Sequence, residues 1–376
     1  MNLLFIQLVL SAGAILGQES EIEFLNCPII PRLPGLKFED YNALGVAAAV
    51  NSTEDLKTFL ASGCDINYNG TFWTDIQDDC EHILFKRLGI SCVRVVKYSG
   101  YTALNLAVIM SSLEVVKLLV EVPGIDLDAG STLPNSYPVF NAARAGDLDK
   151  LKVLVAAGAS LDFRGGEDEL PVMTAAVLSE SVPTVSFLLN TGLDLNQKDN
   201  RQGTPAAVAA AFGYLDILKL LRNGGADLSI PVFTDNQTLI MQAIRNNQTE
   251  VVDYLIGEGL DVNAVDSDCF SNLAYAAELG NVAIVESLLD AGADIDFLNT
   301  EDERPALFQA ISSNRTDTAL VLLQRGAQVN IKTSRGFTST YVAVEVGKFS
   351  VRNILMLKVI LGWKSGSLGG AHQCWG

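Results

Sequence analysis

Histidine is scarce in this sequence, because His82 and His372 are the two histidines among 376 residues. Histidine is the side chain that most often serves as a general base or a metal ligand near neutral pH. The sequence also contains no Gly-x4-Gly-Lys-Ser/Thr loop, no dinucleotide-binding glycine fingerprint and no His-Glu-x-x-His motif. We therefore expect a protein that is not an enzyme and that needs no cofactor and no metal ion.

Basic residues are also few, with 26 Lys and Arg against 44 Asp and Glu and a net charge of −18. Nucleic-acid binding needs clustered cations for the phosphates, so we expect no nucleic-acid ligand. An acidic surface attracts a basic protein partner, although solubility alone explains the same charge. The acidic runs at 167–169 and 301–303 are interpreted as solvated loops.

Long apolar runs are missing after the first residues, so we expect no membrane span in the mature chain. The segment from Leu3 to Leu16 is apolar apart from Gln7 and Ser11, and small residues follow it. This length and pattern predict a cleaved signal peptide at 1–17, and hence a secreted protein or one in the lumen of the secretory pathway. No basic residue precedes the run, so an uncleaved anchor, or a wrongly assigned start codon in a cytoplasmic protein, remains an alternative.

Three residue columns recur in phase along most of the chain, with intervals of 60, 35, 34, 33, 34, 33, 34 and 33 residues. The first column is alanine, at Ala47, Ala107, Ala142, Ala176, Ala209, Ala243, Ala276, Ala310 and Ala343. The second, twelve residues later, is Phe59, Leu119, Leu154, Leu188, Leu221, Leu255, Leu288, Leu322 and Leu355. The third is Gly63, Pro123, Gly158, Gly192, Gly225, Gly259, Gly292, Gly326 and Val359. Columns in phase over nine units predict a repeat protein.

Each column has a physical reason. A small alanine in a first short helix lets neighbouring helices approach, and the leucine lies on the apolar stripe of a second helix. The glycine ends that second helix, where a left-handed backbone is needed. Because one such helix pair with its projecting loop cannot bury its own apolar face, neighbouring units must stack.

The chain thus resembles the ankyrin-repeat family in its period and in the order of its motifs, over about residues 41–357. The best unit runs from Gly203-Thr204-Pro205 to Gly225-Ala226-Asp227. The resemblance implies an all-α ankyrin-repeat solenoid of stacked helix pairs with projecting loops or hairpins. The family's Thr-Pro-Leu-His box keeps no histidine here, since that column holds Asn105, Ala207, Met241 and Ala274.

The columns divide the chain into a signal peptide (1–17), an irregular lead-in (18–40), the repeats (41–357, with an insertion at 68–99) and a tail (358–376). The tail is rich in Gly and Ser and follows an apolar stretch. It is interpreted as a degenerate cap that still packs, as a docking site for another chain, or as the product of an incorrect gene end.

Two sets of residues bear on secretion. Four cysteines near the N-terminus are disulfide candidates, and Cys27–Cys64 with Cys80–Cys92 is the simplest pairing. Free thiols in a cytosolic protein, or a zinc site that also uses His82, are the alternatives. Glycosylation candidates are the five Asn-x-Ser/Thr sequons at Asn51, Asn69, Asn236, Asn247 and Asn314, three of which share the turn between the two helices.

The resemblance implies a non-enzymatic, monomeric scaffold whose ligand is another protein, bound along the face of first helices and loop tips. We expect the contacts to come from exposed loop residues, namely Phe163, Arg164, Phe233, Asp266, Phe270, Phe297, Arg304 and Phe337. A secreted toxin or effector, similar to the repeat arrays of spider latrotoxins, and a cytosolic ankyrin adaptor with a mispredicted start are the alternatives.

Overall fold

The computed structural model describes residues 45, 47–48, 51–67, 71–74, 96–99, 101–130, 136–299 and 302–345. The predicted signal peptide, lead-in and tail lie outside these residues, as does most of the predicted insertion. The chain divides into two compact units, residues 1–193 (unit 1) and 194–376 (unit 2). Each unit is described by itself.

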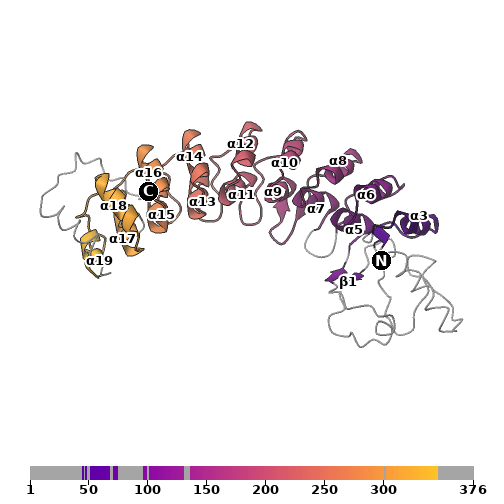
Figure 1. Cartoon of the computed structure of the whole chain (residues 1–376), viewed down its shortest axis with the longest axis horizontal. Helices are drawn as coiled ribbons and strands as arrows, with labels where there is room; N and C mark the ends of the chain where they lie inside the picture. Colours follow the sequence, from indigo (N-terminus) through magenta and orange to yellow (C-terminus); the bar gives the residue numbers. More distant parts are fainter. Residues whose placement is uncertain are drawn as a thin grey trace, which may run out of the picture. The chain divides into compact units, whose positions relative to one another are not determined.

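Unit 1 is a stack of helix pairs, in which a short turn joins a first helix to a second helix (Figure 1). The first helices α5, α7 and α9 pack on one another in order, and so do the second helices α6, α8 and α10. The bounds are α3 (Thr53–Ala61), α5 (Ala103–Met110), α6 (Leu113–Val120), α7 (Pro138–Arg144), α8 (Leu148–Ala156), α9 (Val172–Leu178) and α10 (Val182–Leu189).

Unit 2 repeats the same arrangement. The first helices α11, α13, α15, α17 and α19 pack in order, and each of the first four also packs on its own second helix (Figure 1). The bounds are α11 (Pro205–Phe212), α12 (Leu215–Asn223), α13 (Leu239–Arg245), α14 (Thr249–Gly257), α15 (Asn272–Leu279), α16 (Val282–Asp290), α17 (Ala306–Ser312), α18 (Thr316–Gln324) and α19 (Ser339–Glu345).

The alanine and leucine columns form the core of both units. All nine alanines of the first column are fully buried, at 0% exposure. The second column is buried from Phe59 to Leu322, while Leu355 lies outside the described residues. A methyl group at the alanine position lets adjacent first helices come close, and the leucines fill the space between the two helix layers. The predicted all-α ankyrin solenoid is confirmed.

The glycine column adopts the left-handed backbone that was predicted for it. Gly158, Gly225 and Gly326 have φ values of 100°, 102° and 102° at the ends of second helices. The second repeat departs from the column, because Pro123 occupies it and Gly124 takes the positive φ of 84° instead. One extra residue therefore precedes that turn, which accounts for the single 35-residue interval.

Helix starts are capped without the histidine of the family motif. The hydroxyl oxygens of Thr102, Thr204, Thr238 and Ser271 each accept the backbone N–H three residues later, at 3.2 Å. Asn105, in the histidine column, is fully buried and donates from Nδ2 to the Ala129 carbonyl at 2.7 Å. Such caps contribute about 1 kcal/mol each to helix stability. The start of the first helix is therefore stabilised although the family's histidine is missing.

The projecting loops are short antiparallel hairpins. In unit 1, β1 (Thr71–Thr74) pairs with β2 (Val96–Ser99), and β3 (Arg164–Gly165) pairs with β4 (Leu170–Pro171). In unit 2 the loops close through the isolated bridges Val232–Gln237, Val265–Ser271, Asn299–Arg304 and Lys332–Thr338. Since β1 and β2 lie at the two ends of the predicted insertion, the insertion leaves and re-enters the repeat array at one place.

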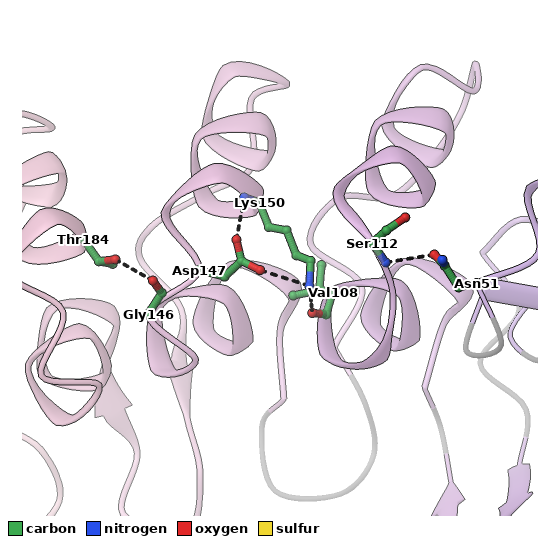
Figure 2. A network of polar contacts seen from close by, with 7 residues as sticks. All are labelled: Asn51, Val108, Ser112, Gly146, Asp147, Lys150 and Thr184. Carbon is green, nitrogen blue, oxygen red and sulfur yellow. Dashed lines mark hydrogen bonds and ion pairs between the residues drawn. The ribbon is translucent and has the colours of Figure 1, made fainter.

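Polar contacts also join successive repeats, as Figure 2 shows for unit 1. The Lys150 ammonium group donates to the Val108 carbonyl of an earlier repeat at 3.0 Å and lies 3.0 Å from an Asp147 carboxylate oxygen. The last carbonyls of a helix have no partner within the helix, so a donor from the next repeat satisfies one of them. In unit 2 the same role falls to Gln248, which reaches the Ala211 carbonyl, and to Arg315, which reaches the Glu278 carbonyl at 2.9 Å.

Candidate protein-binding face

The loop before α15 is closed by a buried carboxylate. Asp266 is 5% exposed, and its Oδ1 accepts the backbone N–H groups of Asp268 at 3.0 Å and Phe270 at 2.9 Å. Its Oδ2 accepts the hydroxyl hydrogen of Tyr275, at 2.5 Å, from the following helix. One side chain therefore ties the loop tip to α15.

An exposed arginine from the neighbouring repeat lies on this loop. The Arg245 guanidinium, at the end of α13, is 5.4 Å from the centre of the Tyr275 ring, and its Nη1 is 3.5 Å from the Tyr275 hydroxyl. The Phe270 ring meets the Tyr275 ring edge-on, with centroids 4.5 Å apart. We call Arg245, Asp266, Phe270 and Tyr275 the Arg245 cluster. Its members come from two successive repeats of unit 2, so stacking fixes their geometry.

The Tyr275 hydroxyl is held in its protonated form. Burial raises the pKa of Tyr275 above its usual value, and the hydrogen bond to the Asp266 carboxylate raises it further. Nearby Arg245 opposes this shift, because a cation favours the phenolate. The hydroxyl therefore donates to Asp266 throughout the physiological pH range, and the arginine is held over a neutral ring.

Exposed apolar side chains lie at the ends of the first helices on either side of Arg245. Phe212, at the end of α11, is 55% exposed, and Leu279, at the end of α15, is 39% exposed. Large apolar side chains that stay in water are typical of contact surfaces when they lie together. An exposed cation with apolar neighbours on both adjacent helices suits a protein ligand.

The eight predicted contact residues do not form one site. In unit 1, Phe163 is half-buried and stacks on Tyr137 at 4.2 Å between ring centroids, and Arg164 is half-buried in β3. In unit 2, only Asp266 and Phe270 are brought together, in the Arg245 cluster.

The remaining predicted residues are spread over the other loops of unit 2. Phe233 is half-buried with a φ of 60°, and Phe337 is exposed and stacks on Tyr341 at 4.8 Å. Arg304 is half-buried and makes an ion pair with Asp302 at 2.6 Å. These loops therefore also contribute partly exposed aromatic and basic side chains.

Among the eight residues, which were expected to be exposed, Phe337 is exposed, five are half-buried and two are buried. Asp266 and Phe297 are 5% and 9% exposed. The carboxylate of Asp266 is used to close its own loop, and the Phe297 ring is a packing residue at the base of the next loop. Asp266 therefore positions the Arg245 cluster without itself facing solvent.

Sequence reasoning missed Arg245 and Tyr275, the two residues that define the cluster. Both lie within helices, whereas loop residues were expected to make the contacts. The available signal was their position, since Arg245 and Tyr275 lie two residues after and one residue before their column alanines, Ala243 and Ala276. The position of Arg245 faces away from the core because the alanine two residues earlier faces into it, whereas the position of Tyr275 is buried in other repeats, as at Leu106 and Ala175.

The cysteine and sequon predictions fall partly outside the described residues, as Cys27, Cys80, Cys92 and Asn69 lie there. Cys64 is buried at the end of the first helix pair. The sequon asparagines in the described residues are all exposed and have positive φ values; they are Asn51, Asn236, Asn247 and Asn314.

Neither a metal site nor a membrane-spanning helix is found among the described residues. Within the ranges that the structure describes, no group of three or more His, Cys, Asp or Glu side chains is placed to hold a metal ion. No helix among these residues combines the length and the apolar character needed to cross a membrane.

Comparison with known proteins points to one family. A family model described as ankyrin repeats (3 copies) matches residues 139–232, 229–299 and 273–360, and an ankyrin-repeat model matches residues 99–129. The chain is 30% identical over 265 residues to the ankyrin repeat and KH domain-containing protein mask-1 of Caenorhabditis elegans, which covers 67% of this chain and 10% of that protein. It is 25% identical over 230 residues to the probable 26S proteasome regulatory subunit p28 of Saccharomyces cerevisiae, covering 58% of this chain and 100% of that protein.

A third relative is the transient receptor potential cation channel subfamily A member 1 of Drosophila melanogaster, 27% identical over 282 residues, covering 69% of this chain and 23% of that protein. The chain thus spans about a tenth of the nematode KH-domain protein and about a quarter of the fly channel. The repeats are the part that is shared. With family models matching more than half of its length and with its column residues stacked in the core, this chain belongs to the ankyrin-repeat family.

Proposed function

We propose that the chain is a non-enzymatic protein-binding scaffold of the secretory pathway or the extracellular space, and that its partner contacts the Arg245 cluster. The family supports the scaffold role, because stacked repeats offer an extended surface. The relative named as a proteasome regulatory subunit matches over its whole length. The part that this chain shares with that relative is thus the whole of that relative, which supports a binding role for the repeats themselves.

The observation that carries the proposal is the fixed position of an exposed arginine. Arg245 is held by the ring and hydroxyl of Tyr275, and Tyr275 is held by Asp266. A side chain that is already ordered loses little conformational entropy when a partner binds. Arginine is also among the residues that most often dominate interface energies.

The surroundings indicate what the partner offers at this place. Guanidinium N–H groups that face solvent donate to a carboxylate or a backbone carbonyl. Phe212 and Leu279 on the flanking helices accept apolar side chains. The net charge of −18 acts at longer range and favours a partner whose surface is basic as a whole.

A matched pair of arginine variants tests the binding face. Full-length wild type, Arg245→Ala and Arg325→Ala would be immobilised, and proteins retained from the extracellular fluid of the source organism quantified by mass spectrometry. Arg325 is a suitable control, because it is exposed like Arg245 and is held in place by an ion pair with Asp290 at 2.6 Å, but it lies after the second helix α18. Retained proteins would then be purified and their Kd values measured.

We expect at least one protein to bind wild type and Arg325→Ala equally, and Arg245→Ala about tenfold or more weakly, since interface hot spots contribute about 2 kcal/mol or more. Equal retention by all three chains, selective loss with Arg325→Ala, or no specific retention would contradict the proposal.

Secretion is tested separately. The N-terminal peptide of the protein isolated from its source would be sequenced. We expect it to begin at or near Gln18, after removal of residues 1–17. A mature protein that retains Met1 would contradict the secretory part of the proposal and leave the binding face untouched.

A further inference from the structure

The turn between the first and second helix of a repeat usually contains a left-handed residue. Seven of the eight described turns have one, with φ between 58° and 85°. The eight positions, four residues after the column alanines, are Asn51, Ser111, Gly146, Glu180, Gly213, Asn247, Gly280 and Asn314. We call these eight residues the turn column. Asparagine tolerates this conformation better than most non-glycine residues, so folding alone explains its presence there.

The backbone conformation of the turn does not explain the residue two positions later, although one of these residues, Thr249, also accepts a hydrogen bond from Asn281 Nδ2 at 3.2 Å. These residues, in the same order, are Thr53, Leu113, Leu148, Val182, Leu215, Thr249, Val282 and Thr316. Threonine follows every asparagine of the turn column, and leucine or valine follows every other turn. The turns that contain asparagine and most of the other turns share the left-handed conformation. Because leucine or valine follows the other turns, the backbone conformation does not require threonine at this position. The pairing of Asn with Thr two residues on is the acceptor pattern for N-linked sugars.

The fourth described sequon, at Asn236, differs from the other three because it lies in a loop between repeats and not in the turn column. Asn236 lies at a loop tip, two residues before Thr238, and Thr238 caps α13 through its hydroxyl oxygen. The loop position of Asn236 is also left-handed in the next repeats, where Cys269 and Glu303 occupy it with φ values of 57° and 53°. Both residues of this sequon therefore have a structural explanation, and Asn236 provides an internal comparison.

The glycine and asparagine turns of unit 2 also differ in their surroundings. A Cβ atom at Gly280 would lie 2.5 Å from the Arg315 side chain, so the next repeat covers this turn. Gly213 is covered in the same way by Gln248. Asn247 and Asn314 are exposed, whereas the middle residues of their own sequons, Gln248 and Arg315, reach back over the preceding turn.

The hydrogen bonds of the asparagines are compatible with a sugar. The Oδ1 atom of Asn51 accepts the backbone N–H of Ser112 at 2.9 Å (Figure 2), and the Oδ1 atom of Asn247 accepts from the Asn281 amide at 2.6 Å. A glycan is attached to Nδ2 and leaves Oδ1 as an acceptor. The contacts to the next repeat therefore persist after modification.

From these observations we propose that Asn51, Asn247 and Asn314 are N-glycosylated, an inference that rests on the proposed passage through the secretory pathway. A glycosyltransferase of that pathway would transfer an oligosaccharide from a lipid diphosphate donor. The anomeric carbon bonds to Nδ2, its bond to the diphosphate oxygen breaks, the lipid diphosphate leaves, and the amide nitrogen loses one proton. Because each first helix runs from the loop tip to this turn, the sugars stand at the opposite end from the loops, and the sugar on Asn247 lies two residues after Arg245, the last residue of α13.

The test uses the full chain in secreting animal cells, with residues 1–17 either native or replaced by an established signal peptide. Glycans would be released by peptide-N-glycosidase in ¹⁸O-water, and the resulting Asn-to-Asp conversion located by mass spectrometry. Thr53→Val, Thr249→Val and Thr316→Val remove each acceptor, keep the asparagine in its turn, and introduce a residue that other repeats carry at this position.

We expect all three asparagines to be occupied, and each Thr→Val variant to lose one oligosaccharide mass while its circular dichroism spectrum stays unchanged. Unmodified turn asparagines in the chain that carries the established signal peptide would overturn the inference, as would occupancy confined to Asn236. Occupancy with the established signal peptide but none with the native segment would support the acceptor sites and contradict the proposed secretion.

Discussion

The side-chain oxygen of Asn263 accepts the backbone N–H of Asp294, from the next repeat, at 2.8 Å. The same contact joins Asn196 to Asp227 in unit 2, at 2.9 Å. In unit 1, the Asn67 side chain accepts the Asp126 backbone N–H at 2.7 Å. Successive repeats are therefore joined by a polar contact at the same turn, in addition to the buried alanines and leucines.

Removing one of these contacts should weaken the stack measurably. Asn263→Ala deletes the acceptor for Asp294 and the side-chain donor to the Gly292 carbonyl at 3.3 Å, and should lower the free energy of unfolding by about 1–2 kcal/mol, at roughly 1 kcal/mol for each hydrogen bond. Urea denaturation followed by circular dichroism measures the change. Asn223→Ala, at an exposed asparagine that ends α12, is the control and should change stability by less than about 0.5 kcal/mol. Equal effects of the two substitutions would argue against a role for the contact.

A second prediction concerns the buried ammonium group of Lys150. Lys150→Met keeps the aliphatic stem but leaves the Val108 carbonyl without its donor, so we expect a loss of about 1–3 kcal/mol in unfolding free energy. Lys152→Met, at an exposed position of the same helix, should be neutral within about 0.5 kcal/mol. Thermal or urea unfolding of both variants provides the comparison. A neutral Lys150→Met would show that the contact with Val108 is dispensable.

The third prediction is a pH dependence at Asp296. Burial raises the pKa of Asp296 above its usual value, although the backbone and side-chain N–H groups of Gln328 partly oppose this. A raised pKa in the folded state means that the folded protein binds the proton more tightly than the unfolded chain. The contribution of Asp296 to the stability of the folded protein is therefore fully present below the pKa that Asp296 has in the unfolded chain. It is lost as the pH rises through the pKa that Asp296 has in the folded protein.

Wild type should therefore lose stability relative to Asp296→Asn as the pH rises from about 4 to 7. Urea unfolding of both proteins across this range measures the difference between their free energies. Asp317→Asn, at an exposed position in α18, accounts for the general effect of removing one negative charge. A difference between wild type and Asp296→Asn that stays constant, or that changes in the opposite direction, would refute the assignment.

The fourth prediction concerns the close approach of β3 to α7. A Cβ atom on Gly165 would lie 2.4 Å from the Phe140 ring. Because the Phe140 side chain is itself buried, Gly165→Ala should cost about 1–3 kcal/mol of stability through overpacking. Gly257→Ala, in α14 with no atom near its added Cβ, should be neutral or stabilising by up to about 1 kcal/mol. The reverse order of stabilities in thermal unfolding would contradict this packing.

The repeat architecture could be predicted because it depends on residues that recur at a fixed interval. Ala142, Leu154 and Gly158 each fill the role that their column implied. The residue pattern within one repeat predicts the two helices of that repeat. The regular interval between repeats predicts that each repeat packs against its neighbours. The paired strands at the two ends of the insertion lacked such a signal, because they occur once.

The candidate site was harder to predict because it is made between repeats. Arg245 has a defined position only when Tyr275 of the next repeat lies beneath it, and no column records that contact. Asp266 looked like an exposed acid in a polar loop, yet its carboxylate is occupied by two backbone N–H groups and a hydroxyl group. From the sequence alone, an acidic loop residue that hydrogen-bonds its own loop cannot be told apart from one that is free to bind another protein.

Hydrogen–deuterium exchange of the complex with the captured partner is the most direct measurement of the central claim. We expect binding to slow amide exchange in residues 264–279, which hold most of the Arg245 cluster, and in the end of α13, while α14 and α16 exchange as in the free protein. Protection confined to α14 and α16, with unchanged exchange around Arg245 and Tyr275, would contradict it.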